Sequence, residues 1–476
     1  MQKTLIKTLI ILGVVLIISA CAGGASPVPT TANLPPTRTV ETVPSNTQVI
    51  IPTDTSPAPT STENPHTTSL LPTSAQPTGY PAAPTSVPEG VLPTAEPLGS
   101  LVAFAWNNLG MHCYQSDYSQ FLILPPNNVY WAQVVARNED PRIVTNGLTA
   151  NYNLPQETKP AAHTNFWDYA ADFGWNLQPG IGLNGKGIAG TLDASTDHFI
   201  SEGVPVVDVN DNGTWDPYPF FVVQVLDSAG KTLATTVNVA PASTEMSCYL
   251  CHVANDIQGV FANILNAHDT LSKTSLASQA LGGKSVLCNS CHADPAMGVM
   301  ANNNSQTTLS GAMHSFHADK LVGTQLPENS CQACHPGPQS ECLRDIMASV
   351  GITCTDCHGG MTEVGDPSRT PWVTLPTCSS CHTEAFTKST TTQIDNPNQK
   401  LTASADALYR NSKAHGGGGV FCAACHGSPH AIYPTITARD NEQSICLQGH
   451  ARPIVECEVC HMEKPEEAFW HFGGDD

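Results

Sequence analysis

The chain has few charged and few aromatic residues for its length. Charged side chains make up 13% of its 476 residues, and aromatic side chains make up 6%. Cationic residues are especially scarce, because 20 Lys and Arg stand against 41 Asp and Glu, for a formal net charge of −21. A surface with this excess of negative charge repels nucleic acid and attracts cationic partners. We therefore expect no nucleic-acid partner.

Long apolar runs are also missing, except within the first twenty residues. Lys3 and Lys7 precede an apolar stretch over 9–18, a pattern typical of an export signal and too short to span a bilayer. The tetrapeptide Ile18-Ser19-Ala20-Cys21 resembles a bacterial lipoprotein cleavage box, which implies that residues 1–21 are a signal peptide with its lipobox and that Cys21 carries the lipid. Secretion without a lipid is the alternative. We expect an extracytoplasmic protein, at the cell surface or in the periplasm, held to the membrane by its lipid anchor alone.

Residues 22–98 are rich in Pro, Thr and Ser. This segment holds 16 of the 38 Pro residues of the chain. Such a composition cannot bury enough apolar surface to fold. We predict a disordered tether between the lipid and a folded body.

Residues 99–245 have the pattern of an all-β domain. Runs at 101–106, 129–137 and 147–154 are rich in β-branched and aromatic residues. The runs 220–226 and 232–239 flank a turn sequence and are expected to pair as a hairpin. Apolar and polar residues alternate along 232–239, so one face should be buried. These patterns predict a β-sandwich-like domain.

Residues 246–476 contain seven copies of the pattern Cys-x-x-Cys-His. Two thiols at this spacing can form thioethers to the two vinyl groups of one porphyrin, and the next residue then supplies an axial imidazole. Zinc is the alternative, but it does not account for a His after every second Cys. The copies are Cys248, Cys251 and His252; Cys288, Cys291 and His292; Cys331, Cys334 and His335; Cys354, Cys357 and His358; Cys378, Cys381 and His382; Cys422, Cys425 and His426; and Cys457, Cys460 and His461.

On these motifs the chain resembles the multihaem c-type cytochromes over residues 245–465. The resemblance implies seven covalently attached haem c groups, with the seven motif His residues as proximal iron ligands. Frequent Gly and Pro between the motifs favour short helices and irregular loops with little regular secondary structure. We expect a heptahaem domain over 246–476.

Whether a protein ligand occupies the second axial position of each iron decides between an electron carrier and an enzyme. Seven further imidazoles precede the motifs or lie among them: His112, His268, His314, His317, His415, His430 and His450. They are enough to make every haem bis-His, although the sequence does not pair them with particular motifs. Several Met residues also lie near motifs, and we expect these to pack against haem instead.

One of these imidazoles, His112, belongs to the stretch Trp106-Asn-Asn-Leu-Gly-Met-His-Cys113. This stretch is similar to an N-terminal domain that precedes haem-binding modules in some bacterial multihaem cytochromes. His112 is either a ligand that this domain donates to the first haem or a buried His at a strand corner.

An acidic loop at 208–216 is a candidate calcium site. Asp208, Asn210 and Asn212 stand at alternate positions, Gly213 is sixth and Asp216 is ninth, as in the first half of a calcium loop. The Glu expected at the twelfth position is absent. The alternative is an Asn-Gly turn between strands with no metal.

Three Cys residues remain outside the motifs and the lipobox. In an exported chain they favour a disulfide, and Cys342 with Cys446 is the preferred pair, which leaves Cys113 over. Cys446 and His450 also resemble a haem motif without its second Cys, so an eighth haem with a single thioether is an alternative.

We therefore expect an electron carrier whose partners are other redox proteins or extracellular electron acceptors. A reductase with one open haem is the first alternative, although no Cys-x-x-Cys-Lys motif marks an active haem. A subunit of a conductive cytochrome filament is the second. The sequence leaves the oligomeric state open.

Overall fold

The computed structural model describes residues 98–297, 299, 307–321, 330–337, 339–376, 409–411, 413–414 and 419–466. Cys21, almost the whole predicted tether, the fifth motif at 378–382 and His415 lie outside these ranges, so the expectations for them stay predictions. Among the described residues, no helix is both long enough and apolar enough to cross a membrane.

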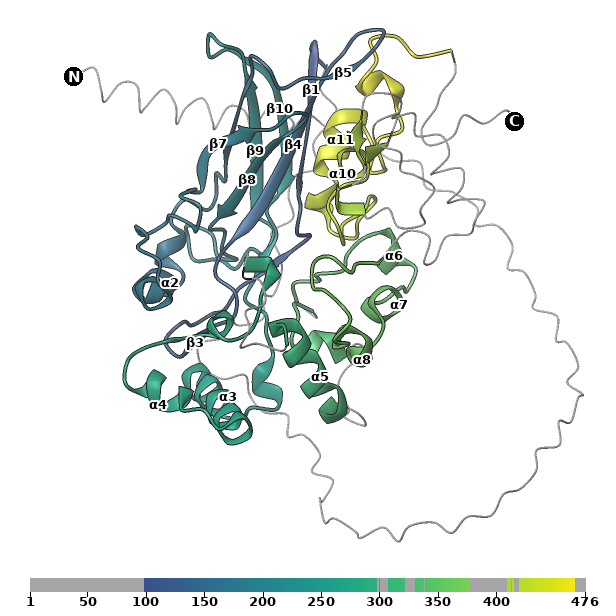
Figure 1. The fold of residues 1–476 in the computed structure, drawn as a ribbon. Coiled ribbons are helices and arrows are strands. Elements are labelled where there is room, and N and C mark those ends of the chain that lie inside the picture. The colour runs from purple at the N-terminus through teal and green to yellow at the C-terminus, as the bar shows by residue number, and fades with distance from the viewer. Residues whose placement is uncertain are drawn as a thin grey trace, which may run out of the picture. The chain divides into compact units, whose positions relative to one another are not determined.

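The first part of the described chain, residues 101–243, is an antiparallel β-barrel-like sheet (Figure 1). Eight strands form it, in the order β1-β4-β8-β7-β6-β9-β10, with β5 added beside β4. Their bounds are β1 (Leu101–Asn107), β4 (Asn128–Ala136), β5 (Arg142–Ile143), β6 (Thr149–Asn153), β7 (Ala189–Ala194), β8 (Phe199–Val204), β9 (Phe220–Leu226) and β10 (Thr232–Val239). The predicted all-β character is confirmed, whereas the strands belong to one sheet that curves into a barrel-like form in place of the predicted sandwich-like arrangement.

Short two-residue strands pair outside this sheet. They are β2 (His112–Cys113) with β11 (Ala242–Ser243), β3 (Phe121–Leu122) with β12 (Val286–Leu287), and β13 (Lys413–Ala414) with β14 (Val420–Phe421). The β3–β12 pair joins the barrel part of the chain to the region of the motifs.

The alternation along β1 explains how the barrel positions its neighbours. Ala103 and Ala105 face the interior of the sheet, in a core that includes Tyr130 and Phe221. Phe104, which lies between them, is fully buried on the other face. Successive side chains of a strand point to opposite faces, so β1 is buried on both, and something outside the barrel must cover its second face.

The predicted hairpin of β9 and β10 is confirmed, and the buried residues near the end of β10 are both polar and apolar, Val239 among them. Thr236 and Asn238 are buried, whereas Val237 is only half-buried and Thr235 is exposed. The Asn238 Nδ2 group donates to the carbonyl of Ala105 on β1, at the seam where the two ends of the sheet meet. Buried polar groups need hydrogen-bond partners, and this seam supplies them.

After residue 245 the chain forms short helices, 3-10 turns and loops that carry the cysteines, with little regular structure, as predicted. The helices after the barrel are α3 (Ile257–Ser272), α4 (Leu276–Leu281), α5 (Leu309–Leu321), α6 (Ile346–Ser349), α7 (Cys354–His358), α8 (Met361–Val364), α10 (Cys422–His426) and α11 (Glu442–Gln448). A further short helix, α2 (Phe166–Tyr169), lies within the barrel part of the chain. The longest helix, α3, buries Ile257, Val260, Phe261 and Leu265, and the Phe261 ring lies 4.7 Å from that of Phe121.

Candidate functional site

Six of the seven motifs lie within the described residues, and each contains one turn of helix. The turns are Cys248–Leu250, Cys288–Ser290, Ser330–Ala333, α7, α10 and Cys457–Val459. In the first of them, the backbone N–H of His252 donates to the carbonyl of Cys248 over 2.9 Å, and the second, third and seventh motifs repeat this bond. Residues three and four apart lie on one side of a helical turn. The local fold therefore directs both sulfurs and the imidazole of a motif to the same side.

The fifth motif is the one that the structure does not describe. Its residues, Cys378, Cys381 and His382, lie outside the described ranges. The predicted attachment of a haem to Cys378 and Cys381, and the proximal role of His382, therefore depend on the sequence pattern alone and stay predictions.

Several motif sulfurs lie in apolar surroundings. Burial raises the pKa of Cys248, Cys288, Cys425 and Cys460 to about 12, so these groups are protonated thiols at neutral pH. Burial at these four attachment points suits a hydrophobic macrocycle.

The second sulfur of three motifs is not enclosed in this way. Cys251, Cys291 and Cys357 are exposed, whereas the first sulfurs Cys248 and Cys288 are only partly exposed. The polypeptide thus covers one attachment point of a motif and leaves the other at the surface. Sequence spacing treats the two cysteines of a motif as equivalent and could not show this difference. The predicted attachment at Cys251, Cys291 and Cys357 stays a prediction.

Three of the predicted distal imidazoles lie opposite a motif imidazole. The ring centroids are 6.5 Å apart for His268 and His292, 5.9 Å for His314 and His335, and 6.1 Å for His430 and His358. In each pair one His belongs to a Cys-x-x-Cys-His motif and the other comes from a different segment. The structure thus gives the second, third and fourth motifs a particular partner, which the sequence could not.

The paired imidazoles on helices are oriented through their Nδ1 atoms. On α5, His314 Nδ1 donates to the Ser310 carbonyl over 2.7 Å. On α3, His268 Nδ1 lies 3.0 Å from the Thr274 hydroxyl. A hydrogen bond at Nδ1 fixes the ring and leaves Nε2 to act as a ligand.

The third and fourth motifs are close neighbours. The Cys331 side chain is hydrogen-bonded to that of Cys354, and this contact is the main cause that raises the pKa of Cys331. Burial lowers the pKa of His335 and of His430 to about 4, and the nearby His358 adds to the effect on each. Both imidazoles are therefore neutral near pH 7, the form that binds metals.

A glycine allows α5 and α8 to approach beside this group. A Cβ atom at Gly365 would lie 2.6 Å from the backbone nitrogen of Ser315, which follows His314. No side chain fits in that space, so Gly365 is what lets the two helices pack closely enough to hold His314 opposite the third motif.

The sixth and seventh motifs pack against the outer face of the barrel. Cys425 and Cys460 border the cluster that covers the second face of β1 and includes Trp106. The Arg137 guanidinium, just beyond β4, donates to the carbonyl of Glu458 over 2.6 Å. The barrel is thus a wall of both motif sites, and this wall is what the two-sided burial of β1 requires.

His461 of the seventh motif is held to the barrel through its backbone. It forms a parallel β-bridge with Asn138, and its carbonyl lies 3.5 Å from the Arg137 guanidinium. Its backbone N–H donates to the carbonyl of Cys457 over 2.8 Å. These bonds fix the position of the residue on its helical turn, and the proximal role of the His461 imidazole stays a prediction.

The remaining described candidates for distal ligands make other contacts. The buried His112 lies with Nε2 2.6 Å from the carbonyl of Pro125, and burial lowers its pKa to about 4. His317 donates through Nδ1 to the Met313 carbonyl over 2.7 Å, and His450 Nε2 lies 3.2 Å from a Glu456 carboxylate oxygen. The contact of His112 fits the alternative of a buried strand-corner His.

In the predicted calcium loop, the oxygen atoms point to other partners. The Asp208 carboxylate accepts hydrogen bonds from Tyr114 and Thr244, and the Asp216 carboxylate is paired with Arg439 at 2.8 Å. The amide oxygens of Asn210 and Asn212 both accept from Thr214 within the turn. In the part of the chain that the structure describes, no cluster of three or more His, Cys, Asp or Glu could hold a metal ion. This geometry has the features of the alternative Asn-Gly turn.

The three spare cysteines are arranged differently from the predicted disulfide. No disulfide joins Cys342 to Cys446, which lies on α11. Cys342 instead packs beside Met111, close to Cys113 on β2. Sequence spacing alone could not reveal this neighbourhood, because the two segments are far apart in the chain.

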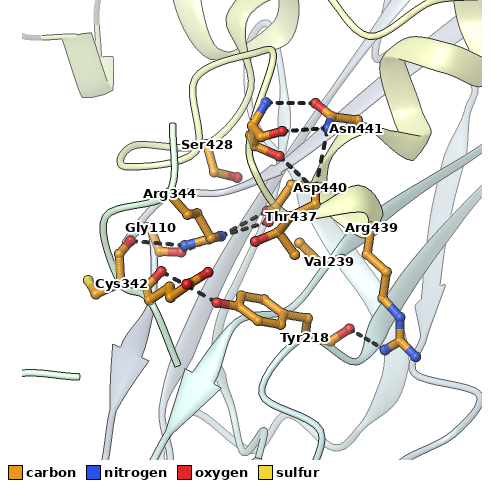
Figure 2. A network of polar contacts seen from close by, with 12 residues as sticks. Gly110, Tyr218, Val239, Cys342, Arg344, Ser428, Thr437, Arg439, Asp440 and Asn441 are labelled. Atoms are coloured by element: carbon orange, nitrogen blue, oxygen red, sulfur yellow. Dashed lines mark hydrogen bonds and ion pairs between the residues drawn. The ribbon is translucent and has the colours of Figure 1, made fainter. Parts of the chain in front are cut away.

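A buried ionic network that sequence reasoning missed joins the barrel to the region of the motifs (Figure 2). Arg344 donates through Nε and Nη2 to the two carboxylate oxygens of Asp440, at 2.6 and 2.8 Å, and also to the carbonyls of Cys342 and Gly110. The neighbouring Arg439 donates to the Tyr218 carbonyl. The chain has only 20 Lys and Arg residues, and two of them have buried guanidinium groups. Removing a guanidinium from water costs free energy, so both groups depend on their buried partners. Nothing in the local sequence of either Arg indicates its burial.

No protein-family model matches this chain, and no curated protein or solved structure is significantly similar to it. What this protein does is therefore inferred from its residues and their geometry.

Proposed function

We propose that the chain is an extracytoplasmic electron-transfer protein with seven covalently attached haem c groups in its C-terminal part, held at the membrane through a lipid on Cys21. The observation that carries the proposal is the set of three imidazole pairs, each made of a motif His and a His from another segment. Its partners on this proposal are other redox proteins or extracellular electron acceptors.

The spacing of the imidazole pairs and the placement of the motif thiols fit a haem. Metal–imidazole bonds are about 2 Å long, so two imidazoles on opposite sides of one ion have ring centres about 6 Å apart. The pairs His268–His292, His314–His335 and His430–His358 lie at 6.5, 5.9 and 6.1 Å. Two thiols on the same turn as the motif His are the groups that thioether attachment needs.

The role of the protein residues is to hold these groups in place. When bound, a haem iron takes up and releases one electron at a time. The hydrogen bonds of His314 and His268 at Nδ1 keep each ring turned toward its partner. A second imidazole occupies the position that a substrate would need, so the paired sites favour a carrier over a reductase.

Contacts between different motifs bring several of the attachment sites close together. Cys334 interacts electrostatically with Cys248 and Cys251 of the first motif, and Cys331 is bonded to Cys354 of the fourth. In the same way Cys460 acts on Cys425. The first, third and fourth motifs thus form one group of neighbours, and the sixth and seventh form another.

Intact-protein mass spectrometry of the chain matured with haem-attachment machinery tests the cofactor. We expect the mass of seven haems to be added to each polypeptide. A mature protein without added haem would refute the proposal. Carbon monoxide binding tests the ligation, because a bis-His iron has no open position. Carbon monoxide bound to a large fraction of the haems in the reduced wild type would instead favour the reductase.

The distal role of His430 can be tested separately. His430→Ala removes one imidazole of the 6.1 Å pair and should open one haem of the seven to carbon monoxide. His163→Ala is the matched control, since His163 is a half-buried His of the barrel part of the chain. Equal carbon monoxide binding in the two variants would contradict the pairing.

A further inference from the structure

Two cysteines outside the haem motifs, Cys113 and Cys342, lie in segments of the chain that run side by side. Cys113 ends β2, where it is in register with Ser243 of β11. The Ser243 hydroxyl lies 2.7 Å from the hydroxyl of Ser340, two residues before Cys342. Further along the same segment, the Arg344 guanidinium donates to the Gly110 carbonyl over 3.4 Å. Hydrogen bonds on both sides of Cys342 therefore fix its segment against the residues around Cys113.

These two cysteines lie close to each other beside one apolar cluster. Cys342 packs on an apolar cluster of Met111, Tyr218 and Val239. Met111 of this cluster is only two residues before Cys113, so Cys342 packs beside the segment that carries Cys113. The two sulfurs are also close enough to interact, since Cys113 contributes, after burial, to raising the pKa of Cys342 to about 12.

We propose that Cys113 and Cys342 form a disulfide that ties the barrel to the segment between the third and fourth motifs. Both sulfurs are thiols in this structure. Each thiol gives up one proton and one electron as the S–S bond forms, and an organic disulfide in the oxidising compartment takes up both electrons and both protons to become two thiols. This bond is independent of the haem proposal and requires only that the chain is exported.

The bond would have a structural purpose. It closes a loop on the order of 230 residues, and long loops are those in which a cross-link most restricts the unfolded chain. It would also prevent the Cys342 thiol from competing with Cys354, the first sulfur of the fourth motif. Cys354 is near enough to contribute to the raised pKa of Cys342.

Peptide mapping of the exported full chain, alkylated before and after reduction, tests the proposal. We expect one cross-linked peptide pair containing Cys113 and Cys342, which disappears on reduction. Alkylation of both residues without reduction would overturn the proposal, as would a cross-link from Cys342 to Cys446 or to Cys354. The same digest reports haem mass on the motif peptides, so the disulfide and the haem proposal can fail separately.

Serine variants provide a second measurement. Cys113→Ser should leave Cys342 open to alkylation, and its unfolding temperature should no longer respond to a reductant. Cys446→Ser is the control, and its unfolding temperature should fall on reduction by as much as that of the wild type. If Cys446→Ser rather than Cys113→Ser abolishes the response, the proposal is wrong. Should Cys113→Ser fail to fold, the wild-type map still decides.

Discussion

Gln443 is the residue whose removal should most directly open the seam of the barrel. Its side chain is fully buried on α11, which follows the sixth motif. The Oε1 atom accepts from the Ala105 backbone N–H on β1 over 2.8 Å and from the Thr236 hydroxyl on β10 over 2.9 Å. The Nε2 atom contacts the Tyr433 hydroxyl at 3.3 Å. A glutamine of the C-terminal region thus bonds both end strands of the sheet.

Gln443→Leu keeps most of the side-chain volume and removes the acceptor. A buried donor left without a partner costs about 1–3 kcal/mol. The Ala105 N–H cannot turn to another acceptor, whereas the Thr236 hydroxyl can rotate. We therefore expect a loss of about 3 kcal/mol, which at about 2–4 °C per kcal/mol lowers the unfolding temperature by about 6–12 °C.

Thermal unfolding of the holoprotein, followed by far-ultraviolet circular dichroism, measures this loss. Gln279→Leu on α4 is the matched control, because Gln279 is exposed and its substitution should cost less than about 0.5 kcal/mol. An unfolding temperature of Gln443→Leu equal to that of the control would refute the role of Gln443 at the seam. In a Thr236→Val background, the cost of Gln443→Leu should be smaller, since one of its partners is already gone.

Three further outcomes follow from buried groups. Arg344→Met leaves the carboxylate of Asp440 buried and unpaired, so the unfolding free energy should fall by about 3–5 kcal/mol, and Asp440→Leu in the same chain should recover part of it. Burial raises the pKa of Glu442 to about 8, so the folded state keeps a proton that the unfolded state loses above its ordinary pKa of 4.5. Stability should therefore decline as the pH rises from about 4.5 to about 8, and in Glu442→Gln this part of the decline should be absent from a series of unfolding temperatures against pH. Gly365→Ala places a Cβ atom 2.6 Å from the α5 backbone and should loosen the third-motif pair, seen as carbon monoxide binding to one more haem. Gly187→Ala, whose Cβ atom would meet nothing closer than 3.6 Å, should bind none, and equal binding by the two glycine variants would count against the close approach.

Local pattern was sufficient to predict β1, β4, β6, β9 and β10, but neither β5, β7 and β8 nor the way the sheet closes. The hairpin strands β9 and β10 have the bounds 220–226 and 232–239 expected from β-branched runs around a turn sequence. Alternation along β10 predicted one buried face but could not show that the polar Thr236 and Asn238 are buried at the seam with β1 and Gln443. The hydrogen bonds that make this possible come from residues more than a hundred positions away, which no window of sequence contains.

In the candidate site, too, the sequence predicted the local features and not the long-range contacts. The motifs are local, so the spacing of each Cys-x-x-Cys-His could be recognised without a structure. The imidazole pairs are not local, since His430 lies 72 residues beyond the His358 that it faces and His314 precedes its partner. In the acidic loop, the local pattern was misleading. Its spacing matched a calcium loop, but Asp216 pairs with Arg439, a residue that the pattern does not include.

The barrel and the motif region therefore depend on each other for their cores. β1 is buried on both faces, and the cluster on its outer face contains Phe421 and Ala424 of the sixth-motif segment. That segment in turn supplies Gln443 to the seam. A barrel expressed without residues after 245 would expose Phe104 and Trp106 to water and leave the Ala105 N–H without its partner. The apolar wall behind the sixth and seventh motifs and the closure of the sheet come from the same contact, so each part of the chain completes the other.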